Sequence, residues 1–201
     1  MSRTSKRQSQ RNTVAIVGDG QTERIYFSDV RDTDRPDNLS IFPDYPRRIG
    51  NYKGVLDRAG ALLGNYSRIY ALVDVDKVIQ DQKQAAYARD KMAAETAGII
   101  VLENNPCFEM WLLLHFVHTG RLFTSCNEVV SQLRSKDKIS DYVKHEKFLQ
   151  NARLYRNYKS RLIEKAIPNA RRLENNRGNQ DSLYPRAEIF RFFEWYLDNG
   201  K

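Results

Sequence analysis

Five acidic residues stand close behind runs of apolar residues that read as buried strands. They are Asp19, Glu23, Asp74, Asp76 and Glu109. Because the carboxyl ends of parallel strands meet at one edge of a sheet, we expect these side chains to lie together. Carboxylates held so closely repel one another and take up protons unless a cation offsets their charge. Oxygen ligands favour Mg²⁺ or Mn²⁺ over zinc, so the pattern predicts a divalent-metal site.

The pair Asp74 and Asp76 gives this site its centre. Residues two apart in a strand share a face, so we expect both carboxylates to point into one space, with Val75 facing the opposite layer. Asp19 and Glu23 would hold the same ion from the first strand end, and Glu109 would complete its shell or bind a second ion. A lone D-x-D pair is weak evidence, whereas agreement among three strand ends is stronger.

The elements that must position these acids alternate along the chain. Apolar, β-branched runs predict strands, and apolar residues at helical spacing predict helices between them. The expected strands are 13–17, 39–46, 68–75 and 99–102, and the expected helices are 22–30, 53–65, 79–97, 107–118 and 187–197, with a polar loop at 31–38. This order predicts an α/β fold with a parallel sheet covered by helices on both faces.

The positive charge of the chain is concentrated in two segments. The net charge is +8; residues 1–12 carry four cations and no acid, and residues 131–177 carry 13 Lys or Arg against 5 Asp or Glu. Such segregation favours a nucleic-acid partner, although a solvated basic face is the plainer alternative. The expected binding residues are Arg153, Arg156, Lys159, Arg161, Arg171 and Arg172, with Tyr155 and Tyr158 placed to stack on bases.

Length and composition suit one folded domain of 201 residues. We expect a disordered basic arm over 1–12, a catalytic core over 13–124 and a basic helical region over 125–201 that packs on the core. Two cysteines are too few for a disulfide framework, and the polar start lacks a secretory core, so we expect a cytoplasmic protein. The longest apolar stretch is far too short to span a membrane.

Other chemistries fit the sequence less well. The residues Cys107, His115, His118 and Cys126 lack the paired spacing of a zinc site, and buried packing is the simpler reading. No Gly-Lys-Ser/Thr follows the Gly18-Asp19-Gly20 turn, so ATP hydrolysis belongs to another chain. The Asp74 pair also lacks the Gly-Thr that a haloacid-dehalogenase-type phosphohydrolase needs.

Three motifs together resemble the RloB-like family. They are Gly18-Asp19-Gly20-Gln21-Thr22-Glu23, Asp74-Val75-Asp76 and the stretch Asn104-Asn105-Pro106-Cys107-Phe108-Glu109-Met110-Trp111-Leu112-Leu113-Leu114-His115-Phe116. That family is similar to Toprim nucleases of the overcoming-lysogenization-defect type and to anti-phage defence proteins that act beside an ABC-type ATPase. The resemblance implies a Toprim fold whose acids hold divalent metal for phosphodiester cleavage. This chain has Asp19 where the family usually has Glu, and Glu23 could compensate for the shorter reach.

Two functions therefore follow from the sequence. The first is a Mg²⁺- or Mn²⁺-dependent Toprim endonuclease acting on DNA or RNA in bacterial defence. The second is a non-catalytic nucleic-acid-binding or regulatory subunit of an ABC-ATPase complex. The aromatic helix 187–197 either covers the sheet of this chain or offers an apolar docking surface to that ATPase.

Overall fold

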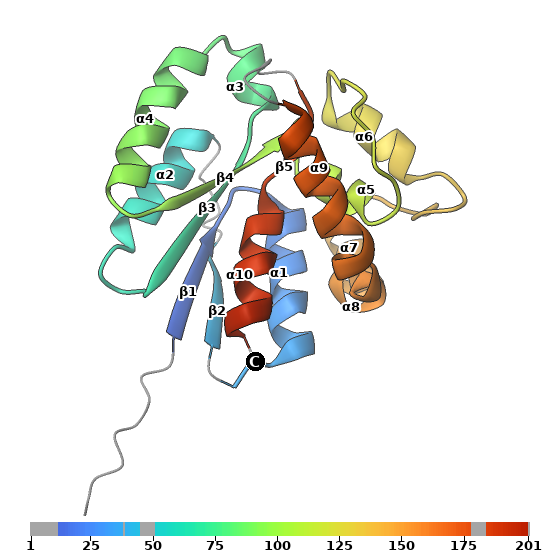
Figure 1. The fold of residues 1–201 in the computed structure, drawn as a ribbon, viewed down its shortest axis with the longest axis horizontal. Helices are drawn as coiled ribbons and strands as arrows, with labels where there is room; N and C mark the ends of the chain where they lie inside the picture. Colours follow the sequence, from blue (N-terminus) through green and yellow to red (C-terminus); the bar gives the residue numbers. More distant parts are fainter. Residues whose placement is uncertain (1–11, 38, 45–50, 178–183, 201) are drawn as a thin grey trace, which may run out of the picture.

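A computed structural model describes residues 12–37, 39–44, 51–177 and 184–200. A five-stranded sheet with strand order β2-β1-β3-β4-β5 forms the centre of the molecule (Figure 1). The strands are β1 (Asn12–Val17), β2 (Leu39–Asp44), β3 (Arg68–Asp74), β4 (Ile100–Asn105) and β5 (Arg186–Ala187). The first four run parallel, and the short β5 pairs antiparallel with β4. The predicted α/β class with a parallel sheet is confirmed, and β5 is an unpredicted addition.

Helices cover both faces of this sheet. In chain order they are α1 (Gln21–Asp34), α2 (Tyr52–Ala61), α3 (Asp76–Gln80), α4 (Gln84–Thr96), α5 (Glu109–Leu114), α6 (Cys126–Leu133), α7 (Glu146–Ala152), α8 (Leu154–Tyr158), a π-helical turn (Leu162–Ala166) that runs into α9 (Ile167–Arg177), and α10 (Ile189–Asn199). The alternation of β1 divides the core between the faces: Val14 and Ile16 join the cluster of α1, α5 and α10, whereas Ala15 and Val17 join that of α2.

The C-terminal region completes the larger of the two cores. The ring of Phe193 in α10 stacks on Trp111 and Tyr155 and meets Tyr26 edge-on. The indole Nε1 of Trp111 donates a hydrogen bond of 3.0 Å to the hydroxyl of Tyr26. Phe190, Phe192, Phe193 and Tyr196 are all buried. Helix α10 therefore covers the sheet of its own chain, and its alternative reading as a docking surface is wrong.

Some predicted boundaries also differ from the structure. Helix α1 continues through residues expected to form a polar loop, because Arg31 and Asp32 face solvent while Val30 remains in the core. The expected helix 79–97 is divided into α3 and α4, and Gln82 between them has a φ of 55°. Among the described residues, no helix is long and apolar enough to cross a membrane.

Candidate functional site

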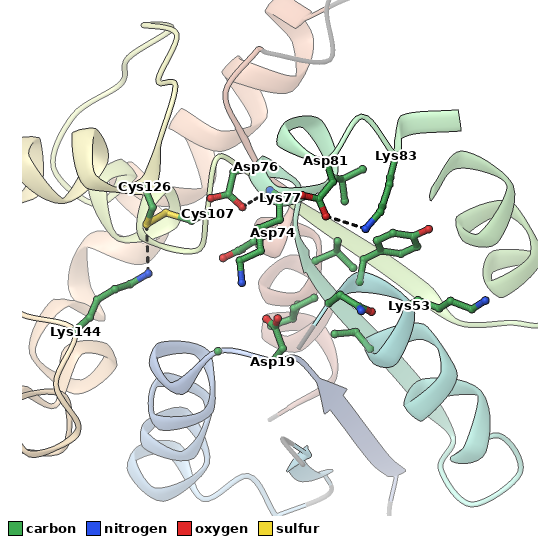
Figure 2. Close-up of a pocket in the computed structure, with 17 residues that line it drawn as sticks. Asp19, Lys53, Asp74, Asp76, Lys77, Asp81, Lys83, Cys107, Cys126 and Lys144 are labelled. Atoms are coloured by element: carbon green, nitrogen blue, oxygen red, sulfur yellow. Dashed lines mark hydrogen bonds and ion pairs between the residues drawn. A yellow bond between two sulfur atoms is a disulfide. The ribbon is translucent and has the colours of Figure 1, made fainter. Parts of the chain in front are cut away.

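The ends of β1 and β3 open on a cavity of about 510 Å³. Asp19, Asp74, Asp76 and Lys144 are among the residues that line it (Figure 2). Asp19 is exposed in the turn after β1, and Asp74 is the last residue of β3. Glu23 and Glu109 lie behind these residues, buried to 4% and 0% exposure. The structure thus brings the five predicted acids to one edge of the sheet.

Asp74 and Asp76 reach the cavity by a different route from the one expected. Strand β3 ends at Asp74, and Asp76 is the first residue of α3, so the two do not share a strand face. The Asp76 carboxylate accepts a hydrogen bond of 2.7 Å from the backbone N–H of Lys77. Asp74 Oδ1 accepts one of 3.2 Å from the side-chain amide of Asn104. The turn from β3 into α3 therefore brings both carboxylates to the cavity, whereas the sequence predicted that strand alternation would do so.

Burial makes the ionised form of Asp74 costly. Loss of solvent raises the pKa of its carboxyl well above the usual value, and the charges of Glu23 and Glu109 raise it further. Burial also raises the pKa of Asp76. The side-chain oxygen of Asn104 beside Asp74 is buried and has no hydrogen-bond partner among the described residues. The site therefore combines surplus negative charge with an unused oxygen acceptor.

Glu23 occupies the first turn of α1 and folds back over Gly20. A Cβ atom at Gly20 would lie 1.8 Å from Glu23 Oε2, so a larger residue there would displace this carboxylate from its present position. Burial, followed by the charge of Glu109, raises the pKa of Glu23 to about 8. In the absence of a bound metal ion, this shift favours the protonated form of Glu23.

Glu109, the first residue of α5, has partners at both oxygens. Its Oε1 accepts hydrogen bonds from the hydroxyls of Tyr142, at 2.7 Å, and Thr22, at 3.2 Å. Its Oε2 lies 2.9 Å from the Lys144 ammonium. Burial lowers the pKa of Lys144, but the negative charges of Glu109, Asp74 and Glu23 outweigh that effect and raise it. Lys144 is thus held as a cation within the acidic cluster.

Sequence reasoning missed Tyr142 and Lys144 as members of the site. Both lie on the connection between α6 and α7, more than 30 residues after Glu109, where no strand or helix periodicity points toward the sheet. The only sequence signal was the general excess of cations in residues 131–177, which includes Lys144. The fold thus uses part of that basic segment to balance the acids.

The two cysteines form a disulfide on the cavity wall. Cys107 lies between β4 and α5, and Cys126 is the first residue of α6. Both line the same cavity as Asp74. The expectation that the cysteines are only packed side chains is therefore wrong. His115 is buried, as expected, with Nδ1 3.0 Å from the Trp111 carbonyl oxygen, and burial lowers its pKa to about 4.

Half of the basic residues expected to bind nucleic acid have acidic partners within the chain. Arg153 pairs with Asp29 at 2.8 Å, Lys159 pairs with Asp34 at 2.5 Å, and Arg171 pairs with Glu194. The Arg161 guanidinium lies over the ring of Phe116. Arg156 and Arg172 are exposed on the surface.

The expected stacking role of Tyr155 is wrong. Its ring is 1% exposed and packs against Phe193, and its hydroxyl donates to Asp34. Tyr158 is partly exposed and contacts Phe116. Three other cations, Lys53, Lys77 and Lys83, line the cavity that contains Asp74 and Asp76 (Figure 2).

Comparison with known proteins gives a single family. A family model described as RloB-like protein matches residues 14–194, which is most of the chain. No curated protein and no solved structure matches the chain.

Proposed function

The chain belongs to the RloB-like family, and we propose that it is a divalent-metal-dependent endonuclease of Toprim type that cleaves phosphodiester bonds of DNA or RNA. The observation that carries the proposal is the convergence of acids from three strand ends on one edge of the sheet. Asp74 and Asp76 line a cavity there, and the charges of Glu23 and Glu109 act on Asp74.

The residues of this site fit Mg²⁺ or Mn²⁺. The ligand atoms would be carboxylate oxygens, which these ions prefer. The raised pKa values of Glu23 and Asp74 mark a place where a cation would relieve repulsion between acids. The unpaired oxygen of Asn104 is a further acceptor for a water bound there. We assign Asp74, Asp76, Glu23 and Asp19 as the residues that would hold the ion.

A divalent ion bound there would neutralise charge on a phosphate and lower the pKa of a water molecule. The protein supplies the remaining functions. Asp74 is oriented by the Asn104 amide, and Glu109 has both oxygens engaged, so we assign it to positioning Lys144 and Tyr142. Lys144 places a positive charge on the cavity wall, where it can pair with a phosphate oxygen.

The family resemblance supplies the biological part of the proposal. We propose that the chain is the effector of a bacterial anti-phage system, acts in the cytoplasm and works beside an ABC-type ATPase. The sequence supports the need for a partner because its Gly18-Asp19-Gly20 turn lacks the Gly-Lys-Ser/Thr of an ATP-binding loop. Expression with and without a related ATPase in infected cells tests this part; full protection by the chain alone would refute it.

A second function is a non-catalytic nucleic-acid-binding or regulatory subunit that keeps the same scaffold. Asp19 favours it, because this side chain is exposed and one carbon shorter than the Glu usual in the family. Such a subunit would bind nucleic acid without cleaving it under any metal condition.

Cleavage assays separate the two functions. The purified chain is incubated with plasmid, single-stranded DNA or total tRNA, each with Mg²⁺, Mn²⁺ or a chelator. We expect metal-dependent cleavage of at least one substrate, slowed roughly hundredfold or more by Asp74→Asn. The matched control is Asp81→Asn, which removes a carboxylate of the same cavity that pairs with Lys83. Equal loss in both variants, or no cleavage by the wild type, would count against catalysis at Asp74.

A further inference from the structure

The disulfide places two sulfur atoms beside the carboxylate cluster. Cys107 is buried and Cys126 is half-buried, and both line the cavity that also contains Asp74 and Lys144. They come from different elements, one before α5 and the other at the start of α6. Figure 2 shows the sulfur pair on the same side of the cavity as Asp76. A small reductant or a metal ion that enters the cavity can therefore reach this pair.

A third ligand atom lies next to the sulfurs. One carboxylate oxygen of Glu109 and the two sulfur atoms all lie within 4.8 Å of one another. Cys126 Sγ is 3.0 Å from Glu109 Oε2. Zinc binds thiolate sulfur at about 2.3 Å and carboxylate oxygen at about 2.0–2.2 Å, usually with tetrahedral geometry. Once the disulfide is reduced, these three atoms would supply three of the four ligands of such a site.

Lys144 shows that a positive charge is stable at this position. Its ammonium lies 2.9 Å from Glu109 Oε2 and 3.3 Å from Cys126 Sγ. Asp74 and Glu23 add their attraction to that of Glu109. The Lys144 side chain is 48% exposed, so it can move toward solvent when another cation takes its place.

We propose that Cys107, Cys126 and Glu109 form a zinc site in the reduced protein, with Zn²⁺ replacing the Lys144 ammonium. An external dithiol reductant would supply two electrons and two protons to the Cys107–Cys126 disulfide. The reductant is thereby oxidised to a disulfide of its own, and the protein keeps two thiols. Zinc binding then displaces both thiol protons to solvent. Water from the cavity that both cysteines line would fill the fourth position. Soft sulfur ligands select zinc over magnesium, so this site is chemically distinct from the carboxylate centre.

Metal titration of the reduced chain tests the proposal without any nucleic acid, so its outcome is independent of nuclease activity. The protein is reduced anaerobically, freed of reductant and titrated with Zn²⁺ against a chromophoric chelator. Co²⁺ serves as a second probe, because thiolate coordination gives a charge-transfer absorption in the near ultraviolet. We expect one Zn²⁺ per reduced chain and no comparable binding by the disulfide form.

Single substitutions identify the ligands. Cys126→Ser should abolish the Co²⁺ charge-transfer band, and Glu109→Gln should weaken zinc binding by about tenfold or more. The control Asp81→Asn removes a carboxylate of the same cavity that is not among the assigned metal ligands, and it should leave zinc affinity nearly unchanged. Thermal unfolding of each variant checks that it is folded.

Lys144→Gln gives the most specific result. It removes the competing ammonium and should tighten zinc binding, whereas a merely structural role for the cysteine pair predicts no such gain. The proposal is overturned if the reduced wild type binds zinc no more tightly than the disulfide form. It is also overturned if Lys144→Gln leaves the affinity unchanged or lowers it, an outcome that can be read even if the cysteine variant fails to fold.

Discussion

Glu23 shows how position changes the chemistry of a single residue. On an exposed helix this side chain would be an ordinary carboxylate, but here it is 4% exposed and subject to the charges of Glu109 and Asp19. Its pKa is raised from 4.5 to about 8. The folded chain therefore keeps a proton on Glu23 over a pH range in which the unfolded chain has released it.

This difference predicts how stability depends on pH. Between about pH 4.5 and about pH 8 the folded state binds more protons than the unfolded state, so the free energy of unfolding decreases as the pH rises. Glu23 alone should contribute a slope of up to about 1.4 kcal/mol per pH unit. The raised pKa of Asp74 makes the free energy of unfolding decrease further as the pH rises. Urea unfolding in chelator at pH 5 and pH 8 measures it.

Two comparisons test the cause of that slope. Glu23→Gln should reduce the pH dependence, and excess Mg²⁺ at pH 8 should restore stability to the wild type by binding the folded state. An unchanged slope in Glu23→Gln would show that other groups produce it.

Gly20 gives a second prediction at the residue scale. Gly20→Ala should displace the Glu23 carboxylate, because the new Cβ would lie 1.8 Å from its Oε2, and should weaken Mg²⁺ binding and any cleavage. The control is Gly60→Ala in α2, where nothing lies within 4 Å of the added Cβ. The control should stabilise the helix by roughly 0.5–1 kcal/mol without affecting metal binding. Isothermal titration and urea unfolding check both; equal metal binding in the two variants would contradict the role of Gly20.

At the scale of elements, the strands were the easiest part to predict and the partners of the acids were the hardest. Buried parallel strands require continuous apolar runs, which is why β1 and β3 are visible in the sequence. The two-residue β5 is too short to leave such a signal. Lys144 sits on an irregular connection, so only the folded chain shows that it pairs with Glu109.

Helix α10 carries the prediction at this scale. Phe193 contacts rings from α1, α5 and α8, so Phe193→Ala should cost about 3–5 kcal/mol of stability. The exposed Ile163 on the π-helical turn provides a control, and Ile163→Ala should change stability by less than about 0.5 kcal/mol. Urea unfolding measures both, and a chain that ends at residue 179 should be unfolded by circular dichroism. A folded, truncated chain would contradict this account of α10.

At the scale of the whole molecule, the cations that remain available to a ligand are only partly the ones that the sequence predicted. Arg153, Lys159 and Arg171 form ion pairs with acids of the same chain. Lys53 and Lys77 instead line the cavity. Sequence position alone could not separate these groups, because ion pairing depends on which elements become neighbours. We expect a nucleic acid to contact the cavity lysines more closely than the paired residues.

Salt-dependent binding tests this expectation. Lys53→Gln and Lys77→Gln should each lower the slope of log affinity against log salt by about 0.9 for a duplex, because each removes one phosphate contact. Lys159→Gln should leave the slope unchanged, since Lys159 already pairs with Asp34. The measurement is fluorescence anisotropy with a labelled duplex in chelator at several salt concentrations. If only Lys159→Gln lowers the salt slope, the nucleic-acid-binding surface lies in the C-terminal region and not at the cavity.

The pairing of β5 with β4 has a consequence for the order in which the protein becomes functional during synthesis. Asn104, which orients Asp74, lies opposite Ala187 in that pairing, and α10 follows directly. The ribosome must therefore translate through α10 before the acidic edge of the sheet is complete, because a domain folds as a unit. A nascent chain that lacks β5 and α10 would therefore carry every acidic side chain of the site and still lack its finished geometry.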